Sequence, residues 1–145
     1  MRSGTSWKTT VEQQRNQMSI IEIPADATLT QLGNMLAQFG SNCANAEYEV
    51  RVAEAYWLEL KAKSDEWLLL ETAKFEDRKM TETAKRAQVL LHNPDLREAL
   101  YAADKANYEL SIKRGERDRW KMAFEATSRI VAVRQMQHDL ERRSG

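Results

Sequence analysis

Apolar side chains recur along most of the chain with the spacing of an α-helix. Thr28 and Gln31 have the spacing of a capping box, and the apolar residues that follow them fall on one helical face. The pattern predicts a short helix over about residues 28–40 that ends near Gly40. The apolar residues of this face are Leu29, Leu32, Leu36 and Phe39.

A longer pattern begins at Ala46 and repeats in steps of four and three residues. These steps form a heptad seam, typical of packed helices, which predicts a helix over about residues 44–77 and a turn near residues 77–83. Thr81 and Thr83 are candidate N-caps for a short helix over about residues 83–91. The residues of the seam are Ala46, Val50, Ala53, Trp57, Leu60, Ser64 and Trp67.

The tripeptide Asn93-Pro94-Asp95 is the clearest helix start in the chain, and it predicts a last helix over about residues 94–142. The seam of this helix has two cations, Lys113 and Arg117, at positions where apolar residues belong. Either the register shifts near Gly115, or these cations face something other than an apolar seam. The seam residues are Ala99, Ala103, Ala106, Leu110, Lys113, Arg117, Trp120, Phe124, Thr127 and Val131.

Together these helices predict an all-α fold, with a short N-terminal helix and a long, coiled-coil-like antiparallel hairpin. We expect one helical domain over residues 28–145, preceded by a flexible N-terminal arm over residues 1–27 in which Ile20, Ile21 and Ile23 form a short extended segment. The aromatic stripes exceed what one hairpin buries, so we expect a homo-oligomer larger than a dimer. The expected interface residues are Trp57, Leu60, Trp120 and Phe124.

Composition narrows the class of protein further. The 145 residues include only 5 Gly, 2 Pro and 1 Cys, which argues against a turn-rich β-sandwich, a disulfide scaffold and a thiolate zinc site. The longest uncharged run, residues 27–46, is only half apolar, so we expect no membrane span. A single cysteine fits a reducing compartment, and we expect a cytoplasmic protein.

No known catalytic motif is present in the chain. We find no glycine-rich phosphate loop, zinc-binding helix or nucleophile elbow. His92 and His138 lie far apart in sequence, and Cys43 has no basic sequence neighbour that would lower its pKa. We therefore expect a protein that is not an enzyme and that has no catalytic residues, no cofactor and no metal site.

The net charge is zero, but the charges are unevenly distributed. Residues 1–19 carry 3 basic and 1 acidic side chains, residues 20–78 carry 5 and 11, and residues 79–145 carry 14 and 10. Cations alternate with aromatic residues, a pattern that favours single-stranded DNA, although such cations also form the solvated flank of many helical bundles. The candidate DNA-binding residues are Lys61, Lys63, Trp67, Lys113, Arg114, Arg117, Arg119 and Lys121.

Two segments resemble the UvsY family, the recombination mediators of T-even bacteriophages. Residues 60–67, with the sequence LKAKSDEW, resemble the family motif LKARLDYY. Residues 89–96, with the sequence VLLHNPDL, resemble the segment VLSADKDVL, which enters the last long helix of that family. The order and approximate spacing agree over about residues 45–140, whereas residues 1–27 have no clear counterpart.

The resemblance implies a helical subunit that assembles into a ring, binds single-stranded DNA and helps to load a RecA-like recombinase onto DNA coated by single-strand-binding protein. It also implies that a phage-encoded chain acts in the host cytoplasm. Lys61 and Lys63 would contact DNA, with Trp67 at the aromatic position, although Lys63, Ser64 and Glu66 replace the Arg, Leu and Tyr of the motif. The alternative is a non-enzymatic coiled-coil protein of a phage, an inhibitor or adaptor that binds a host protein through the acidic residues 47–77 and does not bind DNA.

Overall fold

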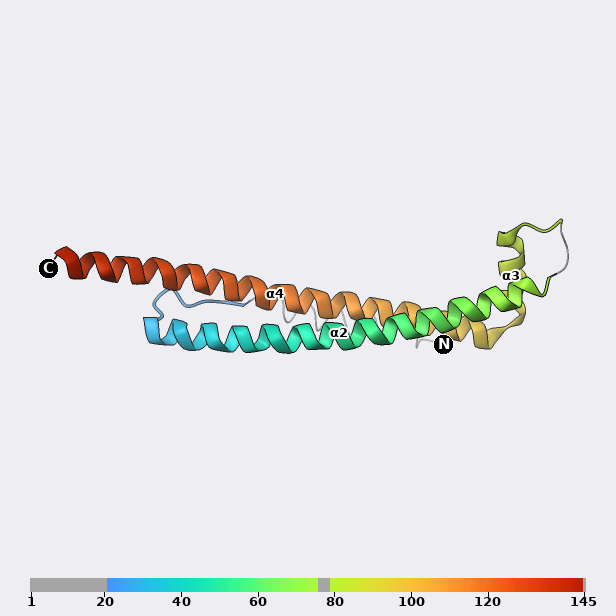
Figure 1. The fold of residues 1–145 in the computed structure, drawn as a ribbon, viewed down its shortest axis with the longest axis horizontal. Helices are drawn as coiled ribbons and strands as arrows, with labels where there is room; N and C mark the ends of the chain where they lie inside the picture. The colour runs from blue at the N-terminus through green and yellow to red at the C-terminus, as the bar shows by residue number, and fades with distance from the viewer. Residues whose placement is uncertain (1–20, 76–78, 145) are drawn as a thin grey trace. The chain divides into compact units, whose positions relative to one another are not determined.

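The computed structural model describes residues 21–75 and 79–144, and all regular secondary structure in these residues is helical. The helices are α2 (Leu29–Ala73), α3 (Glu82–His92) and α4 (Pro94–Ser144) (Figure 1). This confirms the predicted all-α class. The chain forms two compact units: unit 1 comprises the described residues of Met1–Val50 and Ile112–Gly145, and unit 2 is Arg51–Ser111. The prediction of one folding domain over residues 28–145 stays a prediction.

All three helices begin at caps that the sequence predicts. At the start of α2, the Thr28 amide donates to the Gln31 side chain over 2.8 Å, and the Gln31 amide donates to the Thr28 hydroxyl over 3.1 Å. This reciprocal pair is a capping box. The hydroxyl of Thr81 accepts from the amide of Ala84 over 3.1 Å at the start of α3.

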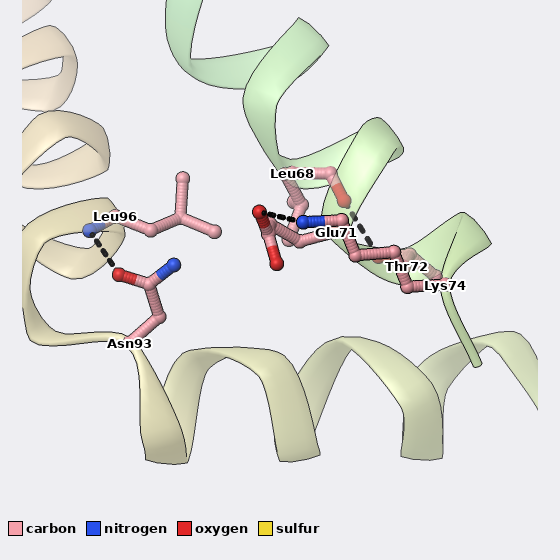
Figure 2. Close-up of polar contacts among 6 residues, drawn as sticks. All are labelled: Leu68, Glu71, Thr72, Lys74, Asn93 and Leu96. Atoms are coloured by element: carbon pink, nitrogen blue, oxygen red, sulfur yellow. Dashed lines mark hydrogen bonds and ion pairs between the residues drawn. The ribbon is translucent and has the colours of Figure 1, made fainter.

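Asn93 lies at the junction of α3 and α4, where its side-chain oxygen accepts a hydrogen bond from the amide of Leu96 over 3.1 Å (Figure 2). Leu96 itself is fully buried and points toward the last turns of α2. There the Thr72 hydroxyl donates to the carbonyl of Leu68 over 2.7 Å. The predicted start of the last helix is therefore confirmed, and its first turn is held by both a cap and an apolar contact.

The structure corrects the two separate helices predicted over about residues 28–40 and 44–77, because α2 is one continuous helix that ends at Ala73. Among the described glycines none has a positive φ, so Gly40 is not a helix-ending residue here. A Cβ atom at Gly40 would lie only 3.3 Å from Cε2 of Phe124 on α4. This glycine therefore allows a close approach of the two helices.

Unit 1 pairs the first part of α2 with the second part of α4 in opposite directions (Figure 1). The contacts run antiparallel, since Phe39 meets Trp120 whereas Glu49 meets Lys113. Leu32 and Thr127 are fully buried in this unit. The hydroxyl of Thr127 donates to the Ala123 carbonyl over 2.7 Å, which satisfies the only polar atom that this side chain buries.

The segment before α2 packs against α4 in unit 1, although the sequence analysis assigned it to the flexible arm. Ile21 and Ile23 line a hollow with Met122 and Ala123 of α4, and Ala27 is buried. The guanidinium of Arg134 donates to the carbonyl oxygen of residue 25 over 2.7 Å. This segment packs on α4 because its apolar side chains leave water there, whereas a polar arm has no such side chains to bury. The rest of the predicted arm, residues 1–20 with Ile20, lies outside the described residues.

Unit 2 contains the remaining parts of α2 and α4 together with α3. Of the predicted α4 seam in this unit, Ala103, Ala106 and Leu110 are buried, as the heptad spacing predicts, whereas Ala99 is only half-buried and the fully buried Leu96 was not among the predicted seam residues. Ser64, the polar interruption of the α2 seam, is also buried, and its hydroxyl donates to the Lys61 carbonyl over 3.1 Å. The side chain is satisfied within its own helix, so it packs in the seam without needing a partner on α4. Among the described helices none is long and apolar enough to cross a membrane.

Two glycines of α2 give a matched test of this packing. Nothing lies within 4 Å of a Cβ atom added at Gly33, whereas one at Gly40 meets the Phe124 ring. We expect Gly33→Ala to raise the free energy of unfolding by about 1 kcal/mol, because alanine is the better helix former. Gly40→Ala should give a clearly smaller gain or a loss, since the ring must shift. Urea unfolding measures both, and an equal gain at the two positions would contradict the close contact.

Candidate functional site

Lys61 and Lys63 lie on opposite flanks of the α2 seam in unit 2. Residues two apart on a helix point in roughly opposite directions, and the buried Ser64 side chain marks the seam between them. The ammonium of Lys61 pairs with Asp65 at 2.8 Å, and that of Lys63 pairs with Glu59 at 2.9 Å. The two cations of the motif therefore do not form one binding site on a single helix face.

Lys63 shares its flank with aromatic rings and exposed apolar side chains. Tyr56 lies seven residues before it, Trp67 four residues after it and Leu70 seven residues after it, so all three fall on the Lys63 side of the helix. Tyr56 is 55% exposed and Trp67 is half-buried. We call Tyr56, Lys63, Trp67 and Leu70 the Lys63 face. The flank of Lys61 has one aromatic ring at comparable spacing, Trp57, together with the apolar side chains of Leu58 and Leu68, so the two flanks differ chiefly in the exposed Tyr56 ring of the Lys63 face.

The ion pair on the Lys63 face is fully solvated. A hydrogen bond from Lys63 lowers the pKa of Glu59 below its ordinary value and raises the pKa of Lys63. Both groups are charged at neutral pH. Because exposed pairs of this kind contribute little to stability, a phosphate can replace the carboxylate beside Lys63 without unfolding the helix.

Unit 1 contains the second predicted basic cluster, and its seam cations face carboxylates. The ammonium of Lys113 lies 3.1 Å from Glu49 of α2 and 3.9 Å from Glu116. The guanidinium of Arg117 lies 3.9 Å from Glu47 of α2 and 3.1 Å from Asp118. Of the two interpretations of these seam cations, the second is confirmed: they face polar groups, and α4 continues as one helix through Gly115.

The other cations of this cluster differ in exposure. Arg114 is half-buried, Lys121 is exposed, and the half-buried Arg119 donates from Nε to the Gly115 carbonyl over 3.3 Å. Lys121 comes close enough to Cys43 to lower the pKa of the thiol, but burial has the larger effect and the pKa is raised overall. The thiol is therefore protonated at neutral pH and is a poor nucleophile. That these cations bind DNA stays a prediction.

The four predicted interface residues are partly covered within the chain. The ring of Trp120 stacks at a tilt on Phe39, with centroids 5.8 Å apart and an interplanar angle of 38°. Phe124 packs beside Gly40 and is 37% exposed, while Trp57 and Leu60 are half-buried. Each keeps some accessible surface, and their role in an oligomer stays a prediction.

No cluster of three or more metal-ligating side chains occurs in the described residues. His92 and His138 are both exposed. His92 lines a hollow in unit 2 with Glu71, Lys74 and Val89, beside the junction shown in Figure 2. Lys74 pairs with Glu71 at 2.8 Å there, so the ammonium and the carboxylate of this hollow are each other's partners.

Sequence reasoning missed the carboxylates that pair with the seam cations. Glu47 and Glu49 lie between the seam residues Ala46 and Val50, where their side chains flank the seam. The two cations in one seam were a sequence signal for acidic residues on the facing helix, but not for which ones, because a heptad pattern leaves the register open.

Comparisons with models of known protein families, with curated proteins and with solved structures found no match to this chain.

Proposed function

We propose that this chain is a non-enzymatic protein that binds single-stranded DNA and acts as a recombination mediator, helping to load a RecA-like recombinase onto DNA coated by single-strand-binding protein. The observation that carries the proposal is the Lys63 face, where a solvated cation lies between Tyr56 and Trp67 on one flank of α2. The resemblance of residues 60–67 and 89–96 to the UvsY family supports the same function.

The Lys63 face has the kinds of side chain that proteins use to bind single-stranded DNA without sequence preference. Unpaired bases stack on aromatic rings, and cations follow the phosphate backbone. Tyr56 has an accessible ring, and Lys63 has a carboxylate partner that is itself in water and therefore exchangeable. Such a protein acts in the cytoplasm, where a phage or bacterial recombinase works on DNA.

The opposite flanks of Lys61 and Lys63 provide a matched test of DNA binding. Lys63→Ala and Lys61→Ala each remove one positive charge and one ion pair within α2. We expect only Lys63→Ala to weaken the binding of a fluorescent oligothymidine, and to flatten the dependence of log K on log salt by about 0.7 for the lost phosphate contact. Fluorescence anisotropy at several salt concentrations measures both quantities.

Tyr56→Ala is the second variant of this test, because its side chain is exposed and its loss leaves the seam intact. It should weaken DNA binding without flattening the salt dependence, since stacking releases no counterions. Equal effects of Lys61→Ala and Lys63→Ala would contradict the assignment to the Lys63 face. Binding that is unchanged in all three variants would remove Lys61, Lys63 and Tyr56 from the DNA site.

A second candidate function is an inhibitor or adaptor that binds a host protein without binding DNA. The pairing of Lys113 and Arg117 with carboxylates favours it, because these pairs reduce the positive field that unit 1 offers to a polyanion. The two functions predict opposite effects on a recombinase.

A mediator must bind DNA in the form that the recombinase prefers, because only differential affinity shifts the assembly of the filament. Substoichiometric protein should therefore shorten the lag before a RecA-like recombinase hydrolyses ATP on DNA coated by single-strand-binding protein. Lys63→Ala should restore the lag, and Lys61→Ala should not. A longer lag, or lost turnover on bare DNA, would favour the inhibitor and contradict the mediator.

We also propose that the chain forms a homo-oligomer larger than a dimer through the accessible parts of Trp57, Leu60, Trp120 and Phe124. Phe124 offers the most exposed ring of this set. Multi-angle light scattering should give a mass above twice 16.8 kDa at micromolar concentration. Phe124→Ser should lower that mass, with Tyr48→Ser as the matched loss of an exposed ring elsewhere. A monomeric parent chain would contradict the proposal.

A further inference from the structure

A hollow of about 290 Å³ opens between α2 and α4 in unit 1. Asn42, Asn45 and Glu49 of α2 line it on one side, and Lys113, Glu116 and Trp120 of α4 line it on the other. None of these residues belongs to the Lys63 face, which lies in unit 2. The lining has two carboxylates and one ammonium, so it carries a net negative charge.

The carboxylate of Glu116 is the least satisfied charged group of this lining. Its side chain is only 15% exposed, and its one ion-pair partner in the described part of the chain is Lys113 at 3.9 Å. Lys113 donates instead to Glu49 over 3.1 Å. Among the described residues no donor forms a hydrogen bond with Glu116, although its oxygens keep access to the hollow. A largely covered carboxylate of this kind is stabilised by any donor that enters.

The two asparagines supply further unused groups. Asn42 and Asn45 lie three residues apart on one face of α2, and within the described residues neither side-chain amide forms a hydrogen bond. Asparagine in a helix interior lowers helix stability relative to alanine, so a structural reason alone does not explain two of them here. Their amide oxygens add neutral acceptors beside Glu116.

Trp120 completes the lining with a flat aromatic surface. Phe39 holds the indole in place at a centroid distance of 5.8 Å. A carboxylate, amide oxygens and an indole plane together match the guanidinium group, which is planar, has five N–H donors and stacks on aromatic faces. A phosphate does not fit, because the lining is net negative and its one ammonium lies near two carboxylates.

We propose that this hollow binds an arginine side chain presented by a partner protein, with Glu116 as its charged acceptor, Asn42 and Asn45 as neutral acceptors, and Trp120 as the stacking surface. The proposal goes beyond DNA binding and does not depend on it, because the residues involved belong to the other unit. It identifies the partner by its chemistry, as a protein segment that exposes arginine.

The test is a titration of the full ¹⁵N-labelled chain with N-acetyl-L-arginine amide, followed by NMR. Saturable shifts are expected for the side-chain amides of Asn42 and Asn45 and for the indole N–H of Trp120. Glu116→Gln keeps the size of the side chain but removes its charge, and it should weaken binding at least about tenfold. Asn45→Ala, at an exposed position, should weaken binding without any risk to folding.

Glu125→Gln is the matched control, because it removes the same charge from an exposed position of α4 outside the hollow, and it should leave binding unchanged. N-acetyl-L-lysine amide and deoxycytidine are the competing probes. Equal or stronger shifts with lysine would overturn the preference for guanidinium, and stronger shifts with deoxycytidine would make the hollow a nucleobase site. Parent-like arginine binding by Glu116→Gln and Asn45→Ala would also overturn the proposal.

Discussion

The narrowness of the seam between α2 and α4 is the constraint on which the other features of this structure depend. Two packed helices cover only one stripe of each other, and here the stripe consists largely of small residues such as Ala46, Ala103 and Ala106. A buried alanine removes little apolar surface from water. The ring of Phe39 is buried, whereas the larger rings of Trp57, Trp67 and Trp120 are only half-buried and keep accessible surface along the edges of the stripe. The chemistry of both proposed sites is located at these edges.

The ion pairs of unit 1 occupy seam positions that apolar residues fill elsewhere. Both pairs between the helices are partly exposed, and such pairs contribute about 0–1 kcal/mol. Their contribution is therefore to register rather than to stability. Sliding α4 along α2 by one heptad would separate Lys113 from Glu49 and Arg117 from Glu47, leaving partly covered charges without partners. The same register brings Glu116 and Trp120 to the level of Asn42 and Asn45.

The helices, their caps and most of the seam were predictable because they depend on local spacing. Thr28 with Gln31, Thr81 and Asn93 act on amides within three residues, and the heptad pattern of residues 46–67 needs no knowledge of the partner. Gly40 was not predictable in this way. A glycine can end a helix, or it can allow two helices to approach closely. Which of these roles Gly40 has depends on Phe124, which is 84 positions further along the chain.

The candidate sites also combine features that depend on local spacing with features that depend on distant residues. That Lys61 and Lys63 fall on opposite flanks follows from helix geometry alone, so their closeness in sequence was a misleading guide to a shared site. The partners of Lys113 and Arg117 and the hollow beside Trp120 depend on which residues of α2 lie at the same level of α4. Heptad patterns leave this choice open to shifts of seven residues.

Both proposed sites combine an aromatic ring with a charged group, and the sign of the charge differs between them. On the Lys63 face an aromatic ring lies beside an ammonium group, whereas in the hollow of unit 1 an indole lies beside a carboxylate that lacks a close partner. Because the neighbouring charge selects the ligand, we propose a strand with phosphates for the first surface and a guanidinium for the second. A mediator needs this combination, since it must bind DNA and another protein at the same time, and the coupling between the two binding events determines whether a filament grows.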